Sequence, residues 1–397
     1  MKSTAALSPF HNDTEMRWKR KKVFKTALLS ILLSSCWLVS KSGETIRYFQ
    51  SATLTLPIAK ITPYVVDFGE ETGMDTLFQA SSKEGYPVSY FRHIQSNVCF
   101  DGKCRMLVVT LYWNTTGRYL GFELPKGEFL SKTDHEPFTS GEYTRLSAIL
   151  GDSLSPLGSF TYNAIVPRAA ADTEKVDAIS SPTAPDVLDH VIKGAAYTTY
   201  KLWHFVYGST QREIERLTTG TLSADLLLKV LESNDLGDKM WVVHRIGPFI
   251  SEHALLQEKV ISLIDNNQYN LSVRIIEMLP VADPLIQRGL AMAFVKHNYA
   301  IKKLIVEKLK TASLLTSEVL MLLTSTLSSL QGESVSSLLE LFRLKKVNDL
   351  AVNRAVADLL RSDNYFVARK AYEFLTKQKI NDTYVEQQIV AFETKRK

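Results

Sequence analysis

The sequence predicts an α+β domain followed by an all-α solenoid, both preceded by an N-terminal export segment. Three observations indicate this order: a cationic stretch and apolar run near the N-terminus, strand-like alternation between residues 44 and 176, and helical segments recurring from about residue 221. We therefore divide the 397 residues into a tail with a signal peptide or anchor (1–43), an α+β domain ending in a long helix (44–220), and a solenoid (221–397).

The excess positive charge of the chain lies at its N-terminus. Residues 1–25 hold seven of the 47 Lys and Arg and two of the 42 Asp and Glu, so the remaining residues carry forty of each sign. A neutral body has no surplus of cations with which to neutralise phosphates. This balance argues against a nucleic-acid partner.

The N-terminal segment has the pattern of a signal peptide or signal anchor. The cationic stretch MRWKRKK at 16–22 precedes an apolar run at 23–40, which is at the short limit for spanning a bilayer. This order of charge and apolar residues predicts a cytoplasmic N-terminus and an exported remainder, attached to the membrane in the cell envelope. Residues 33–36 resemble a bacterial lipobox, which predicts lipidation of Cys36. A cleaved signal and a retained helix are the alternatives.

Cys99 and Cys104 flank a predicted two-residue hairpin. Asp101-Gly102 in VCFDGKCR favours a type I′ turn, which places the two cysteines opposite each other at a separation that a disulfide can span. In an oxidising compartment we expect a disulfide that rigidifies the hairpin tip. A redox-active pair is the alternative.

Strand-rich runs around this hairpin predict an antiparallel meander. Residues 105–113 and 118–124 are separated by the turn signal at 114–117, and residues 88–91 precede the cysteine hairpin. Apolar residues at helical spacing then predict a helix over 140–150.

A single long helix is predicted over 185–207. Pro185 suits the first helical turn, where its missing N–H costs nothing, and Gly208 ends the helix. Its aromatic residues are able to stack on a flavin ring, but such a stripe is more often part of a core. The residues that share this face are Tyr200, Trp203, His204 and Tyr207.

From about residue 221, amphipathic helical segments recur at intervals of about 14–17 residues, so that two helices repeat roughly every 32 residues. This regularity predicts an α-solenoid and resembles short HEAT-like repeats, which imply a surface for a protein partner. The alternative is an irregular helical bundle. The predicted starts lie near Ser223, Gly237, His253, Tyr269, Pro284, Tyr299, Thr316, Gly332, Asn348, Asn364 and Asn381.

Seven residues before the long helix resemble a flavinylation motif. Residues 177–183 read DAISSPT, and the FMN-binding domain family, which includes subunits of the sodium-pumping NADH:quinone oxidoreductase and the Rnf complex, carries D-A-x-S-G-A-T. Asp177, Ala178, Ser180 and Thr183 match, whereas Ser181 replaces the glycine and Pro182 the alanine. The resemblance implies FMN joined to Thr183 by a phosphoester bond, with Asp177, Ser180 and Ser181 in the binding loop.

The local chemistry at Thr183 leaves other roles open. Unpaired N–H groups and the dipole at a helix N-terminus favour an anion, but Ser181 has less conformational freedom than glycine, and Pro182 removes a donor. From the residues alone, the favoured role of Thr183 is a helix N-cap, with Asp186 as the capping-box acid. Non-covalent flavin binding is a further alternative.

The resemblance implies an exported, membrane-associated, FMN-binding-like electron-transfer component whose solenoid docks a protein partner. The alternative is a non-catalytic envelope scaffold with a degenerate flavin site. No nucleotide-binding, zinc-protease or nucleophile-elbow motif (G-x-G-x-x-G, G-x-x-x-x-G-K-[ST], H-E-x-x-H, G-x-S-x-G) is present, so the sequence assigns no catalytic residue and no metal ligand.

Overall fold

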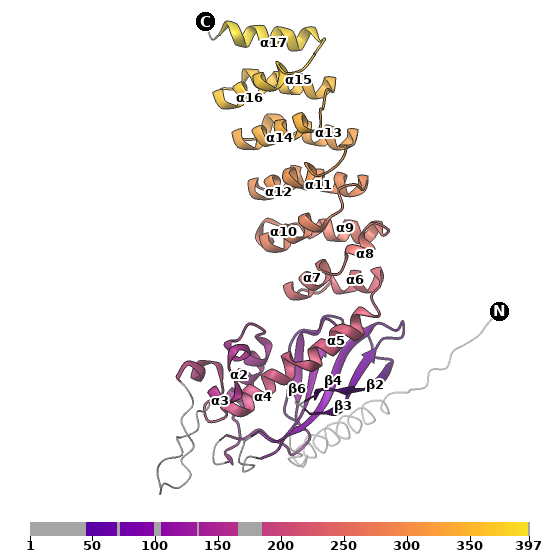
Figure 1. The fold of residues 1–397 in the computed structure, drawn as a ribbon, viewed down its shortest axis with the longest axis vertical. Coiled ribbons are helices and arrows are strands. Elements are labelled where there is room, and N and C mark those ends of the chain that lie inside the picture. The colour runs from indigo at the N-terminus through magenta and orange to yellow at the C-terminus, as the bar shows by residue number, and fades with distance from the viewer. Residues whose placement is uncertain (1–44, 70–71, 99–104, 133–134, 166–184, 396–397) are drawn as a thin grey trace, which may run out of the picture.

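The computed structural model describes residues 45–69, 72–98, 105–132, 135–165 and 185–395. They form an α+β domain with a column of stacked helices extending from one end (Figure 1). An antiparallel sheet followed by an all-α region is the predicted fold class, which is confirmed. One hydrophobic core lies between the sheet and its helices, and a second runs along the column.

Six strands form one antiparallel sheet in the order β1-β6-β5-β4-β3-β2. Strands β2 to β6 make a meander, and β1 pairs with β6 at the edge. The strands are β1 (Arg47–Phe49), β2 (Lys60–Asp67), β3 (Met74–Ser81), β4 (Pro87–Ser96), β5 (Leu107–Asn114) and β6 (Tyr119–Glu123).

The two predicted hairpins join β4, β5 and β6. The turn after Asn114 is present: the Gly117 amide donates to the Asn114 carbonyl at 3.0 Å, and Gly117 adopts a left-handed φ of 80°. On the other side of β5, Ser96 lies opposite Leu107, which is the register that a two-residue turn at 101–102 requires. Cys99 and Cys104 lie outside the described residues.

One face of the sheet, the inner face, is covered by helices. These are α2 (Ser140–Gly151), η3 (Pro156–Ser159), α3 (Tyr162–Ile165), η4 (Pro185–His190), α4 (Ala196–Tyr207) and α5 (Ser209–Thr219). The helix predicted over 140–150 is α2, which begins where Thr139 and Glu142 form a capping box. On the inner face, Trp113 donates from its indole nitrogen to the Val206 carbonyl at 3.0 Å.

Buried polar groups attach α5 to the centre of the inner face. Arg92 of β4 is fully buried, pairs with Asp75 at 2.8 Å and donates to the Thr210 hydroxyl at 2.7 Å. Beside it, the buried Tyr90 hydroxyl lies 2.9 Å from the hydroxyl of Thr218. Each buried group is satisfied by a partner on the other element, which fixes the position of α5 on the sheet.

The predicted single helix over 185–207 is wrong, because the chain turns between η4 and α4. Gly194 in this turn has a left-handed φ of 76°. The buried Thr199 hydroxyl accepts from the Ile192 amide at 3.1 Å and donates to the Ala195 carbonyl at 2.9 Å. This side chain satisfies backbone groups at the break, so the interruption is stable inside the core. Gly208 follows α4 as predicted, but α5 begins immediately after it.

The column is built from helical hairpins that stack in two rows (Figure 1). The first row contains α6 (Ala224–Val230), α9 (Ala254–Ser262), α11 (Pro284–Lys296), α13 (Ser317–Thr324), α15 (Leu350–Asp358) and α17 (Thr383–Thr394). The second row contains α7 (Leu236–Val243), α10 (Tyr269–Met278), α12 (Tyr299–Leu309), α14 (Gly332–Leu344) and α16 (Tyr365–Leu375). The short α8 (Gly247–Ile250) precedes α9.

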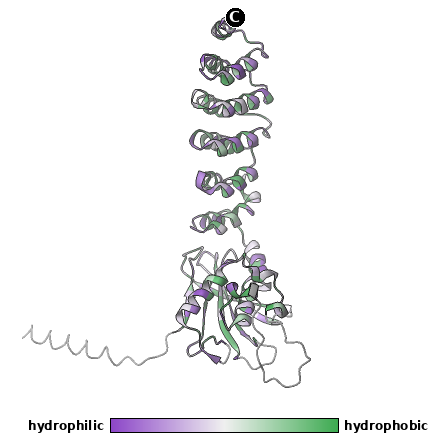
Figure 2. Cartoon of the chain, turned by 90° about the vertical axis from the view of Figure 1, so that its left-hand side faces the viewer, coloured by the Kyte–Doolittle hydropathy of each residue, from purple (hydrophilic) through white to green (hydrophobic). Residues whose placement is uncertain are grey.

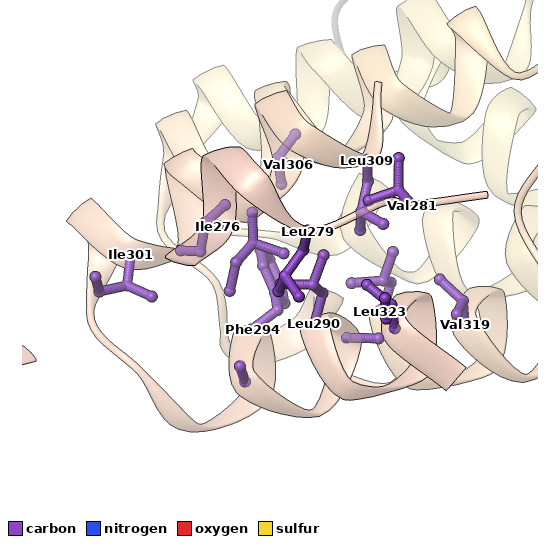
Figure 3. Close-up of a cluster of buried hydrophobic side chains, with 14 of the residues drawn as sticks. Ile276, Leu279, Val281, Leu290, Phe294, Ile301, Val306, Leu309, Val319 and Leu323 are labelled. Carbon is purple, nitrogen blue, oxygen red and sulfur yellow. The ribbon is translucent and has the colours of Figure 1, made fainter. Parts of the chain in front are cut away.

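Each predicted helix start after residue 221 lies within two residues of an observed start. Side-chain oxygens cap many of these helices, among them those of Ser223, Asn298 and Asn364. Every helix of the column carries both hydrophilic and hydrophobic residues (Figure 2). Apolar side chains from α10, α11, α12 and α13 form one cluster between the rows, shown in Figure 3.

Buried amides link successive hairpins at one repeated position, the fourth residue of the first-row helices. Gln287 of α11 donates to the Val281 carbonyl at 2.8 Å and to the Leu314 carbonyl at 2.9 Å. Gln257 of α9 reaches the Asp283 carboxylate at 2.7 Å. The equivalent residue of α13 is Leu320. An apolar side chain therefore fits the position, but it cannot pair the loop carbonyls.

Replacing Gln287 by leucine should destabilise the column by about 1–3 kcal/mol, because one buried and one partly buried carbonyl lose their donor. Urea unfolding followed by circular dichroism measures this change. Gln387→Leu, on the exposed side of α17, makes the same chemical change at the surface and should shift the free energy of unfolding by less than about 0.5 kcal/mol. Equal effects of the two variants would contradict the role given to Gln287.

A buried carboxylate joins the column to the α+β domain. Asp238 of α7 is fully buried and accepts hydrogen bonds from Arg118 at 2.9 and 3.1 Å and from the hydroxyls of Thr53, Thr116 and Ser233 at 2.7, 2.8 and 2.7 Å. Burial disfavours the charged form, but these donors outweigh burial and hold the pKa of Asp238 below its ordinary value.

Replacing Asp238 by asparagine should lower the free energy of unfolding by about 3 kcal/mol near neutral pH, because Arg118 loses its buried partner. The folded carboxylate has the lower pKa, so its stabilising effect is present above the unfolded pKa of about 3.9 and lost as the pH falls through the folded pKa. The difference between wild type and variant should therefore shrink near pH 3. Asp225→Asn on the exposed side of α6 is the control. A pH-independent difference would contradict this assignment.

Candidate functional site

The residues predicted to hold FMN lie outside the described part of the chain. Asp177, Ser180, Ser181 and Thr183 belong to this group, as do the lipidation candidate Cys36 and the predicted Cys99–Cys104 disulfide. Covalent flavin on Thr183 thus stays a prediction from the family resemblance.

Protein produced together with a flavin transferase tests that prediction. If Thr183 is flavinylated, the purified chain should show flavin absorbance that survives denaturation and disappears in Thr183→Ala. Thr173→Ala is the matched control, since it makes the same change at a threonine outside the motif at 177–183. A colourless wild-type preparation would contradict covalent attachment.

The aromatic face of α4 is part of the core, which was the favoured interpretation. The Trp203 indole donates to the Asp152 carbonyl at 3.0 Å, and the Tyr200 and Tyr207 hydroxyls donate to the Phe160 and Leu150 carbonyls at 3.0 and 2.8 Å. His204 lies 3.2 Å from the Leu157 carbonyl, and burial lowers the pKa of its imidazole. These polar groups hold α4 against the segment from α2 to η3, so the face is not a free platform for a flavin.

The clearest candidate site in the described residues is a segregation of charge along the column. The segments 299–315, 332–348 and 365–381, which contain α12, α14 and α16, hold eleven Lys or Arg and four Glu. We call them the basic row. The alternating segments 316–331, 349–364 and 382–395 hold three Lys or Arg and seven Asp or Glu. Helices of the basic row are direct neighbours, so their charges share one side of the column.

The basic row contains a ladder of glutamates that is neutralised internally. Glu307, Glu340 and Glu373 occupy the ninth position of α12, α14 and α16. Lys310 reaches Glu307 at 2.8 Å and Glu340 at 3.1 Å, and Arg369 reaches Glu373 at 2.9 Å. Such exposed pairs add little stability, but they offset three of the four glutamates of the row. The fourth, Glu333, accepts a hydrogen bond from the Tyr299 hydroxyl at 2.5 Å.

Other cations of the basic row are uncommitted. In the part of the chain that the structure describes, no carboxylate pairs with the exposed side chains of Lys303, Arg343, Lys346, Lys377 or Lys379. An array of unpaired cations on one side of the column produces a positive potential along it. That potential suits an acidic ligand.

A shallow recess of about 180 Å³, open to solvent, lies between α12 and α14 within the basic row. The enclosed space within the recess is only about 10 Å³, room for about one water molecule, so the recess cannot hold a flavin and is a surface contact rather than a pocket. It is lined by Phe294, Tyr299, Lys302, Lys303, Val306, Ser334 and Ser337.

The polar groups of this recess favour an anion. Ser334 is only 8% exposed, and its hydroxyl forms no hydrogen bond within the described residues. It lies in the first turn of α14, whose N-cap residue Gln331 makes no side-chain hydrogen bond to the helix amides. Together with Lys302 and Lys303, these groups can bind a carboxylate.

Neither a metal centre nor a membrane span is found in the described residues. No group of His, Cys, Asp and Glu there could hold a metal ion. Every helix in the described ranges is too short or too polar to cross a bilayer. No protein-family model matches the chain, and comparisons with curated proteins and with solved structures found no match.

The sequence analysis missed the basic row, although the signal was present. The helix starts give the repeat phase, and counting charge separately over alternate segments separates the two sides. Net charge conceals this pattern, because the two sides carry charge of opposite sign.

Proposed function

We propose that this protein is a membrane-attached docking scaffold of the cell envelope, whose basic row binds an acidic segment of a protein partner. The segregation of charge between alternate segments of the column carries this proposal. Solubility alone does not require positive and negative charges to lie on different helices of the column. Recognition of an acidic surface does require positive charges to be gathered on one side.

The geometry of the column supports a docking role. Hairpins stacked side by side present equivalent helices at regular steps, so successive carboxylates of an extended partner meet successive cations. The shallow recess lined by Lys302, Lys303 and Ser334 offers one position where a partner carboxylate can meet two ammonium groups and a hydroxyl at the surface. A contact with several groups at once favours one register, because a shift of the partner by one residue removes it.

Attachment to the membrane rests on the N-terminal sequence. The cationic stretch at 16–22 and the apolar run at 23–40 favour insertion with the remainder exported. The scaffold does not require a bound flavin, although FMN on Thr183 would add electron transfer to the same platform.

Binding of a fluorescent oligoglutamate peptide to the full chain tests the basic row. Affinity measured by fluorescence anisotropy should fall as the salt concentration rises and should fall at least about tenfold in the double variant Lys302→Glu with Lys303→Glu. The control replaces Lys259 and Lys296 by glutamate; these lysines lie on α9 and α11 of the first row. An equal loss in the control, or no loss in the recess variant, would overturn the proposal.

Binding in the source cells provides the second measurement. A photoreactive residue at Lys303 should crosslink to a partner whose contact segment is rich in Asp and Glu, whereas the same probe at Met292 of α11 should not. A contact segment without acidic residues would contradict the proposed partner chemistry.

A further inference from the structure

The sheet face opposite the helices, the outer face, carries a continuous line of uncharged side chains. Residues that are direct cross-strand partners form a straight line over all six strands: Phe49, Gly121, Tyr112, Phe91, Phe78 and Pro63. We call this line the aromatic row. With neighbouring strands about 4.8 Å apart, it is about 24 Å long.

The aromatic row is built by direct ring contacts. Phe78 and Phe91 stack at a centroid distance of 4.9 Å, Phe91 and Tyr112 lie 5.7 Å apart, and Phe49 and Tyr112 lie 5.0 Å apart. Gly121 makes the last contact possible, because a Cβ there would lie 2.7 Å from the Phe49 ring. The row therefore continues across β6 without interruption.

The outer face remains accessible and nearly free of charge. Val65, Ile61 and Phe49 are 71%, 54% and 48% exposed. The described helices bind the opposite face, through Trp113, Arg92 and Tyr90. Among the charged side chains on the outer face are Arg47 and Glu123, which lie opposite each other, and Asp67 at the end of β2. The Glu123 carboxylate accepts a hydrogen bond from the Tyr112 hydroxyl of the aromatic row at 3.3 Å. An exposed apolar face of this extent marks an interaction site.

We propose that the outer face rests on the lipid–water interface of the membrane, with the aromatic row among the headgroups. This inference builds on the membrane attachment in the proposed function. Only residues 41–46 separate the apolar run from β1, and six residues span at most about 21 Å. The sheet is therefore held close to the bilayer that the run enters. Aromatic rings suit this interface, where one side is apolar and the other is wet.

Strand pairing with a second copy is a poorer fit for this region. The exposed Val65 and Ile61 lie on β2, which is an edge strand of the sheet. Pro63, between them, has no N–H to donate to a strand of another copy. Contact with a lipid surface through the outer face does not require hydrogen bonds from the backbone of β2.

Photolabelling of the full chain in vesicles tests the inference. The vesicles contain phosphatidylcholine, phosphatidylglycerol and a phospholipid with a photoreactive group next to its headgroup. After irradiation, mass mapping should find lipid on outer-face residues of β2 and β4 and none on α5 or the column. Ile61→Thr with Val65→Thr keeps β-branched residues on the strand and should reduce labelling of β2 at least about fivefold.

The matched control is Leu285→Gln with Leu314→Gln, two column residues that are 54% and 73% exposed, and it should leave the labelling unchanged. Vesicle-bound protein with an unlabelled sheet would overturn this inference alone. A chain that does not bind vesicles would overturn the membrane attachment in the proposed function, and this inference with it. Crosslinks joining the outer faces of two copies would overturn it in favour of a dimer.

Discussion

The buried carboxylate of Asp238 determines how the two parts of this protein are placed. It accepts five hydrogen bonds, which join three segments of the chain: the loop at Thr53, the β5–β6 turn at Thr116 and Arg118, and the start of the column at Ser233. These donors come from three separate pieces of backbone, so the carboxylate can be satisfied in only one relative arrangement.

Apolar contacts reinforce this arrangement. Leu54 and Val88 of the α+β domain belong to the same hydrophobic cluster as the column, and the Lys229 ammonium lies 5.7 Å from the centre of the Tyr86 ring. Apolar burial alone would tolerate small rotations of the column against the α+β domain, because the hydrophobic effect is not directional. The hydrogen bonds of Asp238 are directional and therefore fix the angle between the two parts.

The regular parts of the fold were predictable because local signals agree with tertiary packing there. In the column, capping residues such as Asn298 and Asn364 precede apolar residues at helical spacing, so sequence alone locates the helix starts. The turn at Gly117 was predictable for the same reason.

Tertiary contacts decided the remaining features. The break before α4 depends on the Thr199 hydroxyl, whose partners at Ile192 and Ala195 are set by the packed core and not by helical periodicity. The aromatic row is invisible in any single strand, because its members are six separate residues that only the sheet register brings into line. The basic row is visible in the sequence once the repeat phase is known, whereas the recess at Ser334 requires the packing of α12 on α14.

In the described residues, the larger helix–helix contacts of the column run between adjacent hairpins. Each step contributes a small angular freedom of its own, and these freedoms add along the stack. The tip near α17 therefore sweeps a much wider arc than the base. A stack of this kind bends more easily than a single packed block of the same length.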